Sequence, residues 1–185
     1  MRQTGFTLWL TGLSGAGKTT VAQAVATHLQ EKERMKVQLL DGDLLREVIN
    51  QDLGFSREDR FRNVERAAFI AHLLNTHGVI VLASFITPYQ EMRDYCRKNI
   101  ADYLEVYVKC PLSHCIRRDV KGLYKRALAG EIPHFTGVND PFEEPANPDL
   151  ILETDQESPE ESMNRVLSFL EQKGFLKRLR AGERG

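Results

Sequence analysis

Eight consecutive residues near the start of the chain constrain its fold more than any other feature. Gly12-Leu13-Ser14-Gly15-Ala16-Gly17-Lys18-Thr19 matches the phosphate-binding pattern G-x-x-x-x-G-K-[ST] at every position. In this pattern the glycines let backbone N–H groups approach a polyphosphate closely. The lysine contacts the β- and γ-phosphates, and the hydroxyl of the last residue binds Mg²⁺. The pattern therefore predicts that the chain binds a nucleoside triphosphate.

The residues on either side of this loop predict its structural setting. Residues 6–11 have the composition of a buried strand, and residues 17–32 carry apolar side chains at helical spacing. A strand, a loop and a helix in this order point the N-terminus of the helix at a bound anion. We therefore expect a phosphate site built by Gly12, Leu13, Ser14, Gly15, Ala16, Gly17, Lys18, Thr19 and Thr20.

Strand-like apolar runs alternate with helical patterns along the rest of the chain. Strands are expected at 6–11, 36–41, 79–84, 103–108 and, with a weaker pattern, 150–152. Helices are expected at 17–32, 43–52, 58–77, 89–99, 112–129 and 159–173. This alternation predicts an α/β fold of three layers, in which helices flank a parallel five-stranded sheet. Ligands of such folds bind at the carboxyl ends of the strands.

The stretch 130–149 interrupts this alternation. It has no hydrophobic periodicity and contains Pro133, Pro141, Pro145 and Pro148. A loop of this length inside a compact domain is typical of a functional lid or of a disordered segment. We expect a single domain over residues 1–185, with a lid at about 121–149 that covers the ligand edge of the sheet.

Charge and composition restrict the partners. The formal net charge of −1 gives no overall attraction to DNA, RNA or anionic membranes. No apolar run approaches the roughly 20 residues that span a bilayer. The three cysteines have no paired spacing, and the N-terminus lacks a charged leader followed by an apolar stretch. We therefore expect no nucleic-acid or membrane partner, and a cytoplasmic location.

Acidic side chains follow the second predicted strand. Asp41 and Asp43 stand with Arg46 at a strand-to-helix junction, whereas the third strand ends at Ser84 without an acidic residue. One interpretation is that an aspartate caps the following helix. The other is that an aspartate orients a substrate hydroxyl and accepts its proton.

Two basic segments suggest further anion contacts. Arg60 and Asn63 fall on neighbouring turns of one helix face, after a capping pattern at Ser56. A second cluster, rich in Arg and Lys, spans residues 117–126 just before the proline-rich loop. Both segments have a plain alternative, because charged helix faces are usually solvated. Beside a phosphate loop, however, arginines are well suited to bind oxyanions.

Together these motifs resemble the adenylylsulfate kinases, a family of P-loop kinases. The resemblance runs from about Gly5 to Leu176. It rests on the phosphate loop and on four further motifs. The first three are Asp41-Gly42-Asp43-x-x-Arg46, Phe55-Ser56-x-x-Asp59-Arg60-x-x-Asn63-x-x-Arg66 and Ser84-Phe85-Ile86-Thr87-Pro88-Tyr89. The fourth begins with Asp119-Val120-Lys121-Gly122-Leu123-Tyr124-Lys125 and continues in the lid with Phe135-Thr136-Gly137 and Asp140-Pro141-Phe142-Glu143. Five motifs in this order are far more specific than the phosphate loop alone.

The resemblance implies a reaction, a set of site residues and a homodimer. ATP, with Mg²⁺ held at Thr19, would phosphorylate the 3′-hydroxyl of adenosine 5′-phosphosulfate, giving 3′-phosphoadenosine 5′-phosphosulfate and ADP. The resemblance implies catalytic roles for Lys18, Asp43, Thr87 and Lys121. It implies an acceptor site formed by Asp41, Asp43, Arg46, Phe55, Arg60, Asn63, Ile86, Thr87, Lys121, Leu123 and Phe135.

One departure concerns Thr87, where the family usually carries a serine that is sometimes assigned as a phosphorylated intermediate. Threonine keeps the hydroxyl, and we expect direct transfer from ATP.

Two alternatives to the family function are another small P-loop kinase and a non-catalytic nucleotide sensor or GTP switch. The chain has no N-K-x-D motif, and its third predicted strand does not end in D-x-x-G. These absences argue against a GTPase.

Overall fold

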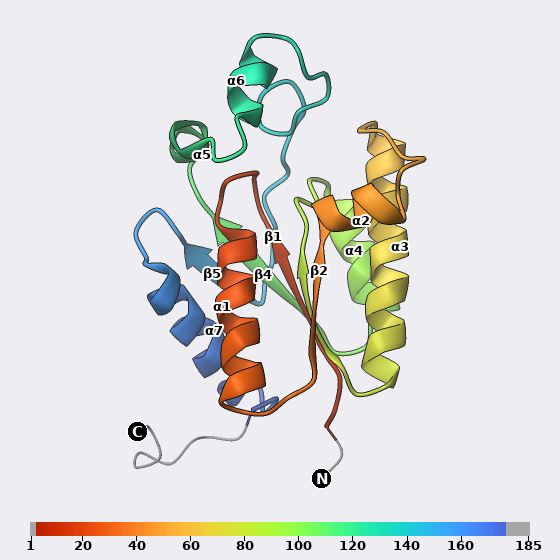
Figure 1. Ribbon diagram of the computed structural model, residues 1–185, viewed down its shortest axis with the longest axis vertical. Helices are drawn as coiled ribbons and strands as arrows, with labels where there is room; N and C mark the ends of the chain where they lie inside the picture. Colours follow the sequence, from red (N-terminus) through yellow and green to blue (C-terminus); the bar gives the residue numbers. More distant parts are fainter. Residues whose placement is uncertain (1–2, 177–185) are drawn as a thin grey trace.

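A computed structural model describes residues 3–176 of the chain and has the predicted α/β architecture (Figure 1). In chain order the elements are β1 (Thr7–Thr11), α1 (Lys18–Glu31), β2 (Val37–Asp41), α2 (Gly42–Val48), α3 (Arg57–Thr76), β3 (Ile80–Ser84), α4 (Gln90–Asn99), β4 (Tyr103–Lys109), α5 (Leu112–Arg118), α6 (Leu123–Leu128), β5 (Leu150–Glu153) and α7 (Pro159–Gln172). Residues 177–185, which include Lys177, Arg178, Arg180 and Arg184, lie outside the described residues.

The strands form one parallel sheet in the order β2-β3-β1-β4-β5. β1 occupies the centre, where Leu8 pairs in register with Leu82 of β3 and Leu104 of β4. All five residues of β1 are buried, as expected for a central parallel strand that is covered on both faces. The fold class predicted from the sequence is therefore confirmed.

Alternating side chains of β1 build a separate core on each face of the sheet. Leu8 and Leu10 pack in a cluster with apolar residues of α1 and α7. Trp9 points the other way and packs with α3 and α4, which cover the opposite face in Figure 1. Successive side chains of a strand point to opposite faces, so these neighbouring residues anchor both helical layers.

The expected helix at 112–129 is wrong in one respect, because the structure divides it into α5 and α6. Asp119 ends α5 with a φ of 25°, and Gly122 precedes α6 with a φ of 65°. The Asp119 carboxylate accepts hydrogen bonds from the backbone N–H groups of Tyr124 and Lys125. A helical periodicity cannot reveal this break, since the residues on both sides keep helical spacing.

Residues 129–149 form an irregular segment that rises with α5 and α6 above the carboxyl ends of the strands (Figure 1). Its far end is fixed to the sheet, because the Asp149 carboxylate accepts from the Glu105 backbone N–H at 2.8 Å.

Between residues 3 and 176, no helix has the length and apolar character needed to cross a membrane.

Candidate active site

A cavity of about 1150 Å³ lies at the carboxyl ends of the strands. The phosphate loop, α2, α3, the turn after β3 and the segment after α5 all contribute to its walls. The predicted site residues that line it are Ser14, Gly15, Gly17, Lys18, Thr19, Thr20, Asp41, Asp43, Arg46, Phe55, Arg60, Asn63, Ile86, Thr87, Lys121, Leu123 and Phe135. Gly12, Leu13 and Ala16 are absent from its lining.

The phosphate loop needs glycine at positions where a side chain would not fit. Gly12 has a φ of 151°, and a Cβ atom there would lie 2.4 Å from the carbonyl oxygen of Val108. Gly17 is the N-cap of α1 in a left-handed conformation, with a φ of 99°. The loop therefore passes close to β4 and delivers the free N–H groups at the start of α1 to the cavity.

Lys18 is folded back over the loop. Its ammonium donates to the carbonyl oxygens of Gly12 and Leu13 at 2.8 and 2.7 Å. Burial, assisted by the nearby ammonium of Lys121, lowers the pKa of Lys18 to about 8, while Cys115, Asp43 and Asp41 oppose the change. Because an anion favours the charged form of the lysine, a bound polyphosphate would raise this pKa.

Three side chains that the sequence did not single out for this role hold the phosphate loop through its carbonyl oxygens. Arg118 donates to the carbonyl oxygens of Gly15 and Thr154, the latter at 2.6 Å. The Thr154 hydroxyl donates to Ala16 O at 2.7 Å, and the Tyr124 hydroxyl donates to Ser14 O at 2.9 Å. Arg118 belonged to the predicted basic cluster, but here it contacts one carbonyl of the phosphate loop and one of the segment after β5. Thr154 follows the short strand β5 and gave no motif that could have identified it.

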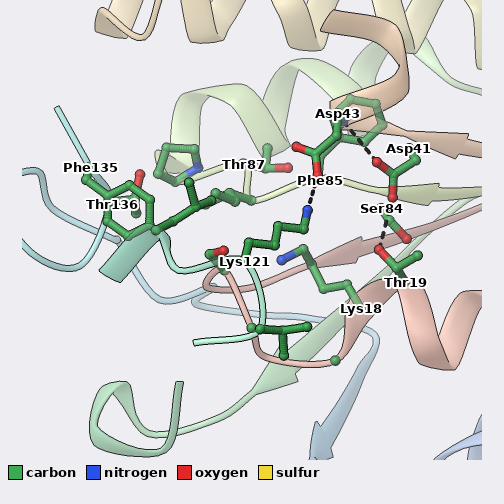
Figure 2. Close-up of a pocket in the computed structure, with 18 of the residues that line it drawn as sticks. Lys18, Thr19, Asp41, Asp43, Ser84, Phe85, Thr87, Lys121, Phe135 and Thr136 are labelled. Atoms are coloured by element: carbon green, nitrogen blue, oxygen red, sulfur yellow. Dashed lines mark hydrogen bonds and ion pairs between the residues drawn. The ribbon is translucent and has the colours of Figure 1, made fainter. Parts of the chain in front are cut away.

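The two aspartates after β2 have different partners. Asp41 accepts from the Thr19 hydroxyl at 2.9 Å and from the Asp43 backbone N–H at 2.9 Å. It therefore caps α2, as the capping interpretation predicted, and it also contacts the phosphate loop. Asp43 reaches into the cavity and forms an ion pair with Lys121. Figure 2 shows the Lys121 side chain reaching Asp43, with the Lys18 side chain beside it.

A second group of cavity residues surrounds Phe55. Arg46 and Arg60 flank the ring of Phe55, with guanidinium carbons 4.5 and 5.6 Å from its centroid. Arg60 also donates to Phe55 O at 3.0 Å and to His134 O at 2.6 Å. It therefore bridges the loop before α3 and the segment 129–149. Phe135, next to His134, is buried against Tyr124 in an edge-on arrangement.

Asn63 and Arg66 behave differently, although both belong to the α3 motif. Asn63 lines the cavity and accepts a hydrogen bond from Asn50 at 2.6 Å. Arg66 is absent from the cavity lining and forms a two-bond ion pair with Asp52. The capping pattern at the start of this helix is confirmed, because the Ser56 hydroxyl accepts from Asp59 N.

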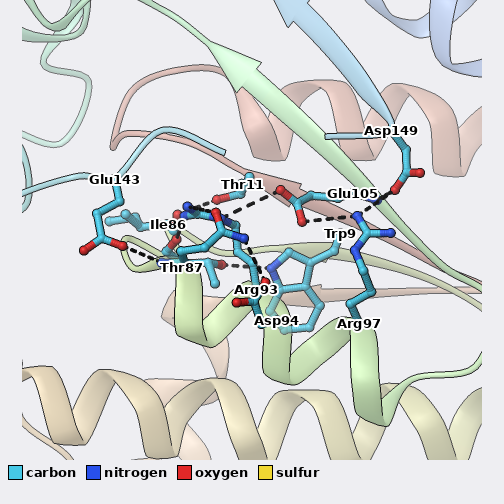
Figure 3. Close-up of polar contacts among 11 residues, drawn as sticks. Trp9, Thr11, Ile86, Thr87, Arg93, Asp94, Arg97, Glu105, Glu143 and Asp149 are labelled. Carbon is cyan, nitrogen blue, oxygen red and sulfur yellow. Dashed lines mark hydrogen bonds and ion pairs between the residues drawn. The ribbon is translucent and has the colours of Figure 1, made fainter. Parts of the chain in front are cut away.

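The turn after β3 is tied to the phosphate loop and to the core. The Thr11 hydroxyl donates to Ile86 O at 2.7 Å. Thr87 has a φ of 46° and a buried side chain, and its hydroxyl accepts from the indole Nε1 of Trp9 at 2.8 Å (Figure 3). Positive φ is rare for a β-branched residue, so the surrounding contacts must hold this turn in place.

Two further hydroxyl groups of the cavity wall were missed. Ser84 Oγ and Thr136 Oγ1 are buried and have no hydrogen-bond partner within residues 3–176. Both residues line the cavity (Figure 2). A buried polar atom without a partner is costly, so these hydroxyls suit contacts with a polar ligand. Both residues belong to motifs quoted for the family resemblance. The sequence pattern did not show that their hydroxyl groups would lack a hydrogen-bond partner.

A parallel sheet of this order, a phosphate loop at the end of its central strand and a basic segment above the same edge define a P-loop kinase. The family model described as adenylylsulphate kinase matches residues 4–153. The chain therefore belongs to the adenylylsulphate kinase family.

Individual relatives support this assignment. The adenylyl-sulfate kinase of Halothermothrix orenii is 53% identical over 174 residues, which is 94% of each chain. The structure of the Mycobacterium tuberculosis APS kinase CysC in complex with AMPPNP and APS has a TM-score of 0.88 and 45% identity, covering 91% of this chain and 99% of that one. A hexameric APS kinase from Thiobacillus denitrificans has a TM-score of 0.71 and 31% identity, covering 95% of this chain and 30% of the other.

Proposed function

We propose that this chain transfers the γ-phosphate of ATP to the 3′-hydroxyl of adenosine 5′-phosphosulfate. The observation that carries the proposal is that one cavity joins a phosphate loop to a second group of aromatic and arginine side chains. The first group, around Lys18, suits a polyphosphate, and the second, around Phe55 and Arg60, suits a base and an oxyanion. Two nucleotides could therefore bind with their reacting ends between the two groups.

Asp43 is the proposed general base. Its carboxylate lies in the cavity opposite the phosphate loop and pairs with Lys121. A carboxylate in this position can orient the attacking hydroxyl and accept its proton, while Lys18 and Lys121 neutralise charge on the phosphates. Phosphoryl transfer depends mainly on positioning and on charge neutralisation, and these residues supply both.

Mg²⁺ is the proposed metal cofactor, bound together with ATP at Thr19. The Thr19 hydroxyl and an Asp41 oxygen lie 2.9 Å apart at the start of α1. Hard oxygen donors of this kind suit Mg²⁺, which keeps several waters and needs few protein ligands. The chemistry that such an ion supplies is neutralisation of phosphate charge.

Direct transfer is the proposed mechanism, without a phosphorylated Thr87. No carboxylate or imidazole lies within hydrogen-bond distance of the Thr87 hydroxyl in the part of the chain that the structure describes. An adjacent base is the usual way to activate a hydroxyl nucleophile, so its absence supports direct transfer. A homodimer is a further proposal, which rests on the family resemblance alone.

The test uses ATP labelled at the γ-phosphate, with Mg²⁺ and adenylylsulfate. Label should appear at the 3′-oxygen of the acceptor, and single-turnover samples should contain no labelled threonine at position 87. Label at another position of the acceptor would contradict the assigned reaction. A phosphothreonine at position 87 that transfers to adenylylsulfate at the turnover rate would contradict direct transfer.

A further inference from the structure

Below the turn after β3 lies a buried polar network that none of the motifs explains (Figure 3). Arg93 of α4 is fully buried and donates to Thr87 O at 2.7 Å and to the side-chain oxygen of Gln90 at 2.8 Å. Its Nε lies 3.8 Å from a carboxylate oxygen of Glu105, which is also buried. Glu105 in turn approaches Arg97. Burying an arginine destabilises the fold unless its charge is paired. The presence of Arg93 in the core therefore suggests that it has a specific role.

The network contacts Thr87, the one residue of the turn after β3 with a left-handed backbone. Arg93 of α4 donates to the Thr87 carbonyl oxygen, and Figure 3 shows Trp9 of β1 reaching the hydroxyl of the same residue. This contact stabilises the positive φ of Thr87, which a threonine would not adopt unaided. Glu105 supplies the opposite charge that keeps Arg93 in place.

Trp9 fixes the direction of the Thr87 hydroxyl. An indole N–H can only donate a hydrogen bond, so the Thr87 oxygen must accept from it. The hydroxyl proton is then left for another acceptor, and the structure shows none for it within residues 3–176. Because Thr87 lines the cavity, that proton is available to an oxygen of a bound nucleotide.

We propose that Trp9 and Arg93 are positioning residues, which together hold Thr87 as a hydrogen-bond donor toward an oxyanion in the cavity. Glu105 supports Arg93 in this role. The inference rests on the proposed function only in taking that oxyanion to belong to the reacting nucleotides. It assigns a function to a buried charge network that lies outside the cavity lining.

The test is a double-mutant cycle measured by kcat/KM for the acceptor. Thr87→Val removes the hydroxyl and should lower kcat/KM by about 10- to 100-fold, the effect of one hydrogen bond in a transition state. Thr87→Ser restores the hydroxyl and should recover most of the kcat/KM that Thr87→Val loses. Trp9→Phe removes the indole donor and should lower kcat/KM, but it should have little further effect in the Thr87→Val background.

Arg93 needs a paired substitution, since removing it alone leaves the Glu105 carboxylate buried without its partner. Arg93→Met combined with Glu105→Gln removes both charges. In a protein that keeps Thr87, this paired substitution should lower kcat/KM. In the Thr87→Val background it should lower kcat/KM little further. If the reductions in kcat/KM multiply in both cycles, Trp9 and Arg93 act independently of Thr87 and stabilise only the fold. That result would overturn the proposal.

A spectroscopic measurement separates this inference from the proposed function. Trp9 is the only tryptophan of the chain, so the intrinsic tryptophan emission reports on its environment alone. Thr87→Val and the Arg93→Met, Glu105→Gln variant should both shift the emission of the ligand-free protein, because each frees the indole N–H from Thr87. If the paired variant keeps the wild-type emission while Thr87→Val shifts it, Arg93 does not position Thr87. Wild-type protein that fails to phosphorylate adenylylsulfate would instead contradict the proposed function.

Discussion

Replacing Asp43 by asparagine tests the proposed general base with little change of shape. The Asp43 and Lys121 side chains are 64% and 57% exposed, so their ion pair contributes about 0–1 kcal/mol to stability. The free energy of unfolding should therefore fall by no more than about 1 kcal/mol. A positioned base contributes about 10²- to 10⁴-fold in rate, and Asp43→Asn should lower kcat by a factor in this range.

The assay follows ADP formation at saturating ATP and adenylylsulfate, with chemical denaturation measured on the same preparations. Asp52→Asn is the matched control, because Asp52 is another exposed carboxylate paired with a cation, Arg66, and it is absent from the cavity lining. This control should keep the wild-type kcat. If Asp43→Asn keeps kcat within about threefold, a difference below 1 kcal/mol, proton acceptance by Asp43 is refuted. Equal losses in the two variants would point to a general effect of removing an exposed acid.

Three other predictions follow from the site. Arg60→Ala removes the guanidinium beside Phe55 and should lower kcat/KM for adenylylsulfate by roughly 10- to 150-fold, the cost of one charge-assisted hydrogen bond; Arg62→Ala, an exposed residue paired with Glu58, should have no such effect. Because burial lowers the pKa of Lys18 to about 8, its charged form is lost as pH rises through that value. Affinity for ATP should then fall above pH 8 with proton uptake on binding, and a constant affinity up to pH 10 would contradict this. Protease cleavage within 130–149 should be slowed by ADP with adenylylsulfate, whereas equal rates would indicate a permanently fixed loop.

The sequence was sufficient for the fold and for the location of the site, because both follow from local patterns. Continuous apolar strands and helical periodicity identified the parallel sheet, and the rule that ligands bind at its carboxyl edge led to Asp43, whereas the role of Thr87 was implied only by the family resemblance. The break at Asp119 could not be predicted, since it depends on one carboxylate that caps the next helix. A periodic pattern carries no information about such a contact.

The contacts between distant segments could not be predicted either. Arg93 and Glu105 lie in an ordinary helix and an ordinary strand, and only the fold brings them together under Thr87. Thr154 reaches the phosphate loop across 138 residues of sequence. The bonding of Lys18 to loop carbonyls is also a property of the three-dimensional loop. Sequence motifs thus predicted most of the residues that meet in the cavity, but not what each one contacts.

The most direct test of the proposed function compares acceptors in a single coupled assay of ADP formation. Purified protein is given MgATP with adenylylsulfate, AMP, dephospho-coenzyme A or gluconate, and each reaction is repeated without Mg²⁺. We predict rapid ADP formation with adenylylsulfate alone among these acceptors, and only when Mg²⁺ is present. Equal ADP formation with AMP would show that the arginines beside Phe55 do not select the phosphosulfate group, and would contradict the assigned substrate.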